Sequence, residues 1–147
     1  MRKRAPILII LLASLAAIAG EDEPLEQLKA RAEQAGQADQ AKLFIEIARR
    51  QLKEADKLYE SGHLEAARAL VAEIATYSER AGEAARSSGK RLKDTEVSIR
   101  KMSKRLSDMR RALTFEERPP LDQAVERMEK VRTDLLTQMF SKKGKKS

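Results

Sequence analysis

The stretch 64–113, LEAARALVAEIATYSERAGEAARSSGKRLKDTEVSIRKMSKRLSDMRRAL, decides the fold of this chain. Apolar or small residues recur in it at alternating spacings of three and four, which is the pattern of a helical packing seam. The first half of the seam is rich in Ala and Ser, and the second half is rich in Leu, Ile and Met. The seam positions are Leu64, Ala67, Val71, Ile74, Ser78, Ala81, Ala85, Ser88, Leu92, Thr95, Ile99, Met102, Leu106, Met109 and Leu113.

A Ser-Ser-Gly segment at 87–89 lies in the middle of this seam and leaves two interpretations open. A loop usually resets the register, and the register here continues, so the pattern favours one long helix from Leu64 to about Thr114. The alternative is a break at Gly89 and an up-down bundle of helices of similar length. A helical glycine costs about 1 kcal/mol relative to alanine, which supports the break. Small residues that would let a neighbouring helix approach closely recur at Ala75, Gly82 and Gly89.

Amphipathic patterns flank the seam on both sides. Upstream, apolar residues at helical spacing over 25–59 predict one helix, bent at Gly36, that ends near Ser61. Gly62 then marks a turn, because glycine takes a left-handed conformation past a helix end at little steric cost. Downstream of the Pro-Pro pair at 119–120, a last helix is predicted with an apolar face made of Leu121, Ala124, Val125, Met128, Val131, Leu135 and Met139.

Composition agrees with these patterns. Aromatic residues are 3% of the chain, and Cys and Trp are absent, so neither disulfides nor a sheet with aromatic pairs is indicated. We therefore predict an all-α fold of long antiparallel helices, either a helical hairpin or coiled coil, or a three- to four-helix bundle. The single helical domain is placed at 20–140, and the lysine-rich residues 141–147 are predicted to form a disordered tail.

The N-terminal residues 1–19 have the pattern of a cleavable signal peptide. Three cations at 2–4 precede an apolar run at 5–19, and the run ends in Ala17-Ile18-Ala19, which predicts cleavage before Gly20. The run is shorter than the roughly 20 apolar residues of a membrane-spanning helix. We therefore expect a periplasmic or secreted bacterial protein.

The net charge of +7 comes from the two ends of the chain. The signal segment 2–4 carries three of the extra cations and the tail carries four, which leaves 23 cations against 23 anions in the body. Nucleic-acid binding needs a basic surplus on a folded face. We therefore expect no nucleic-acid partner.

One local excess of cations remains within the body. Residues 90–113 hold nine cations and three anions, and acidic segments lie on both sides of them. The excess indicates either charge pairing between neighbouring helices or a patch for an anionic surface. Together with the tail it gives the candidate anionic-surface contacts Lys142, Lys143, Lys145, Lys146, Arg100, Lys101, Lys104 and Arg105.

The turn at Gly62 is flanked by small and aromatic residues at regular positions, namely Ala55, Tyr59, Gly62, Leu64, Ala67, Val71 and Ile74. Over residues 51–81 this pattern resembles one degenerate tetratricopeptide-like helical hairpin. In that family, small residues, an aromatic residue and a glycine turn let two helices pack closely. The segment has no second copy, and no family is assigned to the whole chain. The resemblance implies protein or peptide binding.

Candidate chemistry is sparse. His63 is the only histidine, and its Glu-x-x-His spacing from Glu60 would need a second copy to form a di-iron site. Zinc needs three or four ligands, and the chain has no Cys and no second His. We therefore predict no metal, no cofactor and no enzymatic activity. The methionines Met102, Met109, Met128 and Met139 are predicted to pack in the core.

These patterns predict a non-enzymatic exported helical protein, acting as a periplasmic protein-interaction or scaffold module. Its expected partner is another envelope protein or a second copy of itself. The alternative is a binder of the envelope surface, either anionic lipid or wall polymer, through the basic tail and the basic segment 90–113.

Overall fold

The computed structural model describes residues 23–144 of the chain, except the side chains of 142 and 143. The predicted signal peptide at 1–19 and the lysines at 145 and 146 lie outside the described residues. The described part is helical and contains no strand, which confirms the predicted all-α fold. Its elements are α1 (Leu25–Gln34), α2 (Gln37–Glu60), α3 (Leu64–Ser88), α4 (Leu92–Arg111), the 3-10 helix η1 (Phe115–Glu117) and α5 (Pro119–Gly144).

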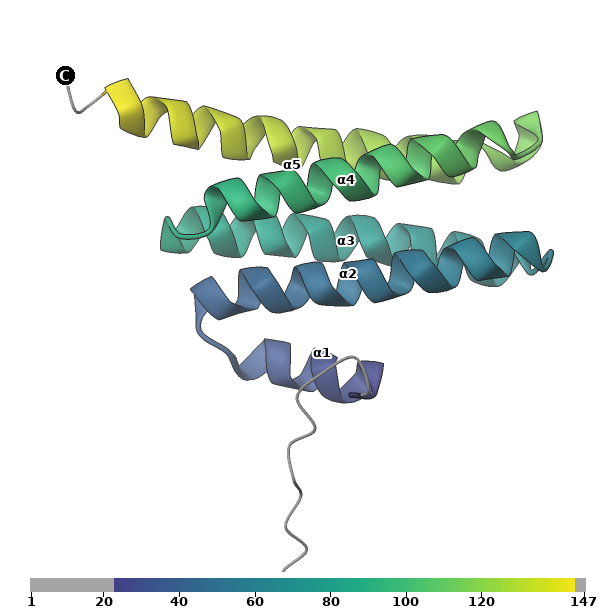
Figure 1. The fold of residues 1–147 in the computed structure, drawn as a ribbon, viewed down its shortest axis with the longest axis horizontal. Helices are drawn as coiled ribbons and strands as arrows, with labels where there is room; N and C mark the ends of the chain where they lie inside the picture. The colour runs from purple at the N-terminus through teal and green to yellow at the C-terminus, as the bar shows by residue number, and fades with distance from the viewer. Residues whose placement is uncertain (1–22, 145–147) are drawn as a thin grey trace, which may run out of the picture.

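The long helices form two antiparallel hairpins that pack on each other (Figure 1). The first hairpin is α2–α3 and the second is α4–α5, with α5 packed along α3 and α4 beside α2. The short helix α1 packs against α2 on the side of the first hairpin away from the second (Figure 1). The molecule is therefore a four-helix bundle with one additional short helix.

The prediction of one continuous helix from Leu64 to about Thr114 is wrong. The chain reverses between α3 and α4, where Gly89 and Arg91 take left-handed backbone conformations with φ of 67° and 61°. The register continues through this turn because both helices direct their apolar stripe into the same core. Ile74 on α3 and Ile99 on α4 are both fully buried. A periodicity shared by two core-facing helices therefore looks the same as one long seam.

The first predicted helix is also divided in two. At Ala35 and Gly36 the backbone is extended, with ψ of 157° at both residues, so the helix breaks there instead of bending. Leu28 and Ala32 fix α1 to the hairpin, since both are fully buried. The side-chain amide of Gln40 also donates a hydrogen bond to the Ala32 carbonyl at 3.1 Å.

The other predicted breaks lie close to their expected positions. The helix α2 ends at Glu60, and Gly62 takes the left-handed conformation with φ of 78°.

At the C-terminus α5 includes residues 141–144, for which composition predicts disorder. The helix continues through them because no residue before Gly144 breaks it, and Ser141 Oγ donates to the Thr137 carbonyl.

The core is one apolar cluster to which all five α-helices contribute. Three of the four methionines predicted to pack in it, Met102, Met109 and Met128, are buried, and Met139 packs against it partly exposed. Polar contacts join the two hairpins around this core. Arg127 on α5 donates to both carboxylate oxygens of Glu79 on α3, at 2.7 and 2.8 Å. This bond lowers the pKa of Glu79 below its usual value.

Candidate functional site

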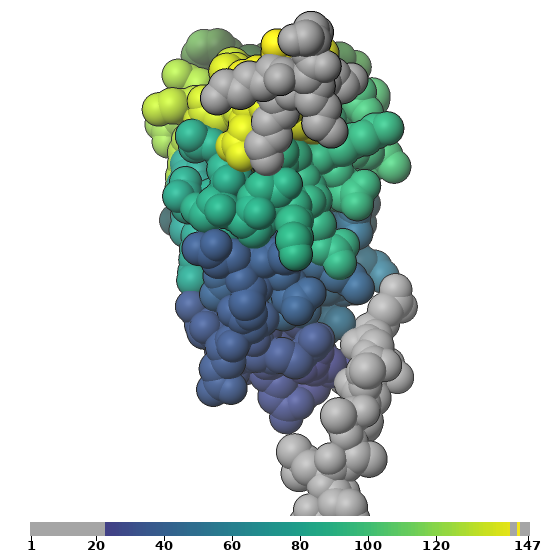
Figure 2. Space-filling view, turned by 90° about the vertical axis from the view of Figure 1, so that its left-hand side faces the viewer, coloured from purple at the N-terminus to yellow at the C-terminus, as the bar shows by residue number. Residues whose placement is uncertain are grey.

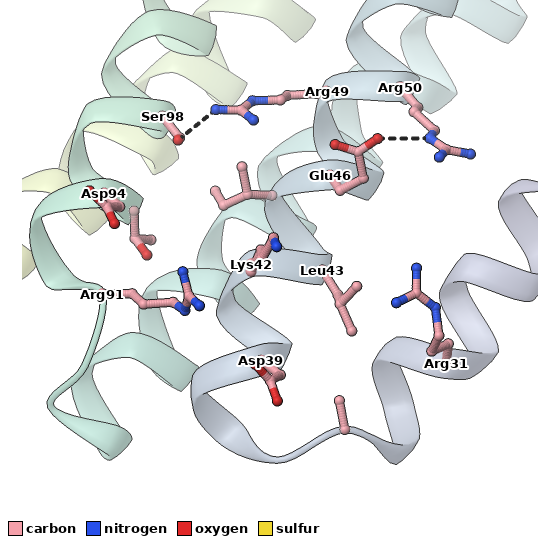
Figure 3. Close-up of a pocket in the computed structure, with 13 residues that line it drawn as sticks. Arg31, Asp39, Lys42, Leu43, Glu46, Arg49, Arg50, Arg91, Asp94 and Ser98 are labelled. Carbon is pink, nitrogen blue, oxygen red and sulfur yellow. Dashed lines mark hydrogen bonds and ion pairs between the residues drawn. The ribbon is translucent and has the colours of Figure 1, made fainter. Parts of the chain in front are cut away.

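A concave trough lies over the first half of α2, between α1 and α4 (Figure 3). Its volume is about 730 Å³. The helix α2 forms its floor, α1 forms one wall and the start of α4 forms the other (Figure 3). The lining residues are Arg31, Ala35, Asp39, Lys42, Leu43, Ile45, Glu46, Arg49, Arg50, Arg91, Asp94, Thr95 and Ser98.

The two breaks in the chain position this trough. The turn at 35–36 sets α1 on one side of α2, and the turn at 89–91 starts α4 on the other side (Figure 1). Both turns lie at the end of the molecule that Figure 2 presents. The outer face of α2 is consequently open toward this end and carries polar side chains at spacings of three and four.

Five cationic side chains line the trough, and they differ in how well they are neutralised. Arg31 donates to the Glu23 carboxylate at 2.7 Å, and this hydrogen bond lowers the pKa of Glu23 below its usual value. Arg50 donates to Glu46 at 3.0 Å. Arg49 donates to the neutral hydroxyl of Ser98 at 2.8 Å, so that contact leaves its charge uncompensated.

The remaining two cations, Lys42 and Arg91, are exposed and have no ion-pair partner within residues 23–144. Two of the three carboxylates in the lining, Asp39 and Asp94, are likewise exposed and unpaired there. With five cations against three carboxylates, the lining has a net positive charge. The trough therefore offers ionic groups of both signs, with cations in the majority.

The trough has the chemistry of a binding site. Its floor carries the nearly buried aliphatic side chains Leu43 and Ile45 between charged groups. The hydroxyl of Ser98 already accepts a hydrogen bond from Arg49, and the lining contains no histidine that could activate it. Open lining with aliphatic and ionic groups suits recognition of a peptide or a small anion.

Across residues 23–144, no three His, Asp or Glu side chains are grouped so that they could hold a metal ion. His63 lies exposed in the turn, with Nδ1 2.8 Å from Ser61 Oγ. No helix in the same range is long and apolar enough to cross a membrane.

Exposed apolar side chains do not form a second candidate site. Phe115 and Phe140 are the large apolar side chains that are exposed among the described residues. They lie near opposite ends of α5, which at 1.5 Å per residue is about 39 Å long. They are therefore too far apart to form one apolar patch.

The structure divides the cations that the sequence singles out on α4. Arg100 and Lys104 line a smaller cleft of about 380 Å³ between α4 and α5. Arg105 instead pairs with Asp56 on α2. Lys101 is exposed and makes no ion pair within residues 23–144. The candidate tail contacts, Lys142, Lys143, Lys145 and Lys146, have no described side chains.

Charge pairing between helices accounts for part of the basic excess at 90–113. Arg105 pairs with α2, and Arg110 pairs with Asp122 on α5. Lys104 and Arg111 share Asp108 on their own helix, at 2.9 and 3.7 Å. Among the described residues, several cations of this segment thus keep no ionic partner, Arg91 in the trough among them.

Sequence reasoning missed most of the trough. It counted Arg91 within the basic excess but selected none of Arg31, Lys42, Arg49 and Arg50. The available signal was the polar face of the helix predicted over 25–59, where charged residues recur at helical spacing. Such spacing is typical of any solvated helix face. Only the positions of α1 and α4 distinguish this face as a site.

Comparison with models of protein families, with curated proteins and with solved structures finds no match to this chain.

Proposed function

We propose that this protein is a non-enzymatic, exported helical module that binds another protein of the bacterial envelope through the trough. The observation that carries the proposal is the trough itself, a concavity of about 730 Å³ with aliphatic floor residues and with unpaired charges on its floor and one wall. Peptide segments are recognised by surfaces of this kind, in which side-chain pockets and ionic groups alternate. The likeness of 51–81 to a tetratricopeptide hairpin supports the same class of function.

Export is the second part of the proposal and rests on the signal-peptide pattern at 1–19. On this proposal the partner also lies outside the cytoplasm. The helices around the trough share one apolar core. Such an arrangement suits a scaffold, because a preformed site binds its partner with little loss of conformational entropy.

Site-specific photo-crosslinking of the exported protein tests this function. With benzoylphenylalanine at Asp39 in the trough, we expect one discrete crosslinked envelope protein, joined to a chain that begins at Gly20. The matched control carries the same group at Gln123, an exposed residue of α5, and is expected to give no such product. The measurement is mass spectrometry of the crosslinked peptides. Equal crosslinking from both positions, or a chain that still carries residues 1–19, would contradict the proposal.

A second candidate function is binding to the anionic envelope surface. The exposed cations Lys90, Lys93 and Lys101 favour it, because they make no ion pair within residues 23–144. The C-terminal end of α5 lies at the same end of the molecule as the turn between α3 and α4 (Figure 1). Lys90, which belongs to that turn, therefore lies at the end of the molecule where α5 ends within the lysine-rich residues 141–147.

Deletion of residues 141–147 separates the two functions. Surface binding predicts that the deletion releases the protein from isolated envelopes. It also predicts that added salt releases the undeleted protein in the same way. Protein binding through the trough predicts unchanged crosslinking from Asp39 and unchanged envelope association. Fractionation of envelopes at low and high salt, followed by immunoblotting, measures the difference.

A further inference from the structure

We propose that the segment recognised by the trough is an acidic peptide, whose carboxylates contact Lys42, Arg49 and Arg91. This inference rests on the proposed function and specifies the chemistry of the partner. Three observations carry it: the convergence of these three cations, the way two of them are held, and the shape of the surface around them.

The three cations converge from two helices that are far apart in sequence. Lys42 and Arg49 are seven residues apart on α2, so they lie on the same face, about 10 Å apart along the helix axis. Arg91 extends from the start of α4 toward α2 (Figure 3). The carboxylates of one short segment can therefore reach all three cations at once.

The hydrogen bond between Arg49 and Ser98 holds the guanidinium in place without neutralising it. Ser98 is buried, so its hydroxyl is a fixed acceptor on α4. A guanidinium has five N–H donors, and one bond to Ser98 leaves others for a two-point contact with a carboxylate. Arg49 is thus oriented before any ligand arrives.

Arg91 occupies a backbone conformation that arginine seldom adopts. Its φ of 61° makes it the one non-glycine residue with positive φ in the described part of the chain. A left-handed conformation is sterically unfavourable for an L-residue. Glycine would remove this cost, and strained residues of this kind gather at binding sites. The arginine at this position places a cation on the wall of the trough.

The surroundings favour a peptide over a lipid surface. The three cations lie in a concavity, whereas a flat layer of headgroups contacts the convex parts of a protein surface. Asp39 and Asp94 also line the trough, and a continuous array of phosphates offers these carboxylates no hydrogen-bond donor. A peptide supplies backbone N–H groups for these carboxylates and aliphatic side chains for Leu43 and Ile45.

Fluorescence anisotropy with a labelled peptide tests the inference on the mature chain. The probe is a fluorescein-labelled peptide of about twelve residues in which glutamate alternates with alanine, and its control has glutamine in place of glutamate. We expect saturable binding of the glutamate peptide, weakened by about 0.5 M NaCl because screening shortens the range of the ion pairs. Binding of the glutamine peptide is expected to be at least about tenfold weaker.

Two triple variants with the same change in net charge locate the site. The trough variant, Lys42→Gln with Arg49→Gln and Arg91→Gln, is expected to lose at least about tenfold in affinity. The control, Lys53→Gln with Lys57→Gln and Lys130→Gln, removes three exposed cations that lie outside the trough. It is expected to lose less than about threefold. If the triple variant does not fold, the single variant Lys42→Glu, at an exposed position, replaces it in the binding test. This variant is also expected to weaken binding.

Three results would overturn the inference: equal losses in the two triple variants, equal binding of the two peptides, or no peptide binding by a folded wild-type chain. Co-sedimentation with phosphatidylglycerol vesicles that only the trough variant loses would assign the cations to a lipid surface instead. The proposed function has a separate test, which is the crosslink from Asp39. If the trough variant keeps the protein crosslinked at Asp39, protein binding stands and the acidic segment is excluded.

Discussion

Replacing Arg132 with methionine is expected to lower the free energy of unfolding by about 3 kcal/mol. Arg132 on α5 donates from Nε and Nη2 to one oxygen of Glu96 on α4, at 3.0 and 2.9 Å. The side chain of Glu96 is only 7% exposed, so loss of Arg132 leaves a buried carboxylate without its closest cation. Urea unfolding followed by circular dichroism measures the change.

The matched control is Arg100→Met, at the other cation beside Glu96. Arg100 is 55% exposed and lies 4.0 Å from the same carboxylate, so its loss is expected to cost under about 1 kcal/mol. Replacing both members of the buried pair, Glu96→Leu with Arg132→Met, is expected to restore most of the stability lost in the single variant. Equal effects of Arg132→Met and Arg100→Met would show that the buried pair does not stabilise the contact between α4 and α5.

Replacing Gly82 with leucine is expected to lower the free energy of unfolding by about 3 kcal/mol. Gly82 lies where α3 meets α5, and a Cβ atom there would stand 2.3 Å from Cγ1 of Val131. Valine has one strongly preferred rotamer in a helix, so it cannot easily move aside. The two helices would have to separate. Thermal and urea unfolding both report the loss.

Gly36→Leu is the control for the added side chain, because nothing lies within 4 Å of the corresponding Cβ position and φ is negative. It is expected to change stability by under about 1 kcal/mol. Val131→Ala in the Gly82→Leu background is expected to recover part of the loss, since it removes the clashing methyl group. No recovery, or a loss at Gly36 as large as at Gly82, would contradict close packing of α3 on α5 as the cause.

The all-α fold could be predicted because spacing of apolar residues reports helices directly. Gly82 is an example of a packing detail that the spacing also predicted. It lies in a stripe of small residues, which indicated a close helix neighbour, and Val131 on α5 is that neighbour. The break at Gly89 could not be decided in the same way. Leu92 keeps the seam in register with Ala85 although the chain reverses between them, so periodicity alone does not separate one helix from two.

The candidate site was less predictable for a physical reason. Lys42 and Arg49 lie on a polar helix face that resembles any exposed face in sequence. They become part of the floor of a trough only because α1 and α4 pack on either side of α2. Arg91 belongs to the basic excess at 90–113, but the favoured continuous helix gave no reason to expect it at a turn. Its left-handed backbone occurs where the chain reverses between α3 and α4.

The order of the helices has a consequence for how fast the chain folds. The turns at 61–63 and 89–91 each join helices that pack on each other, and η1 with its flanking residues joins α4 to α5. Much of the contact surface therefore forms between neighbours in sequence, which gives a low contact order. Helical domains of this kind fold on the order of microseconds to milliseconds. The hairpin of α2 and α3 makes the most extensive contact. We therefore expect it to form the nucleus on which the remaining helices condense.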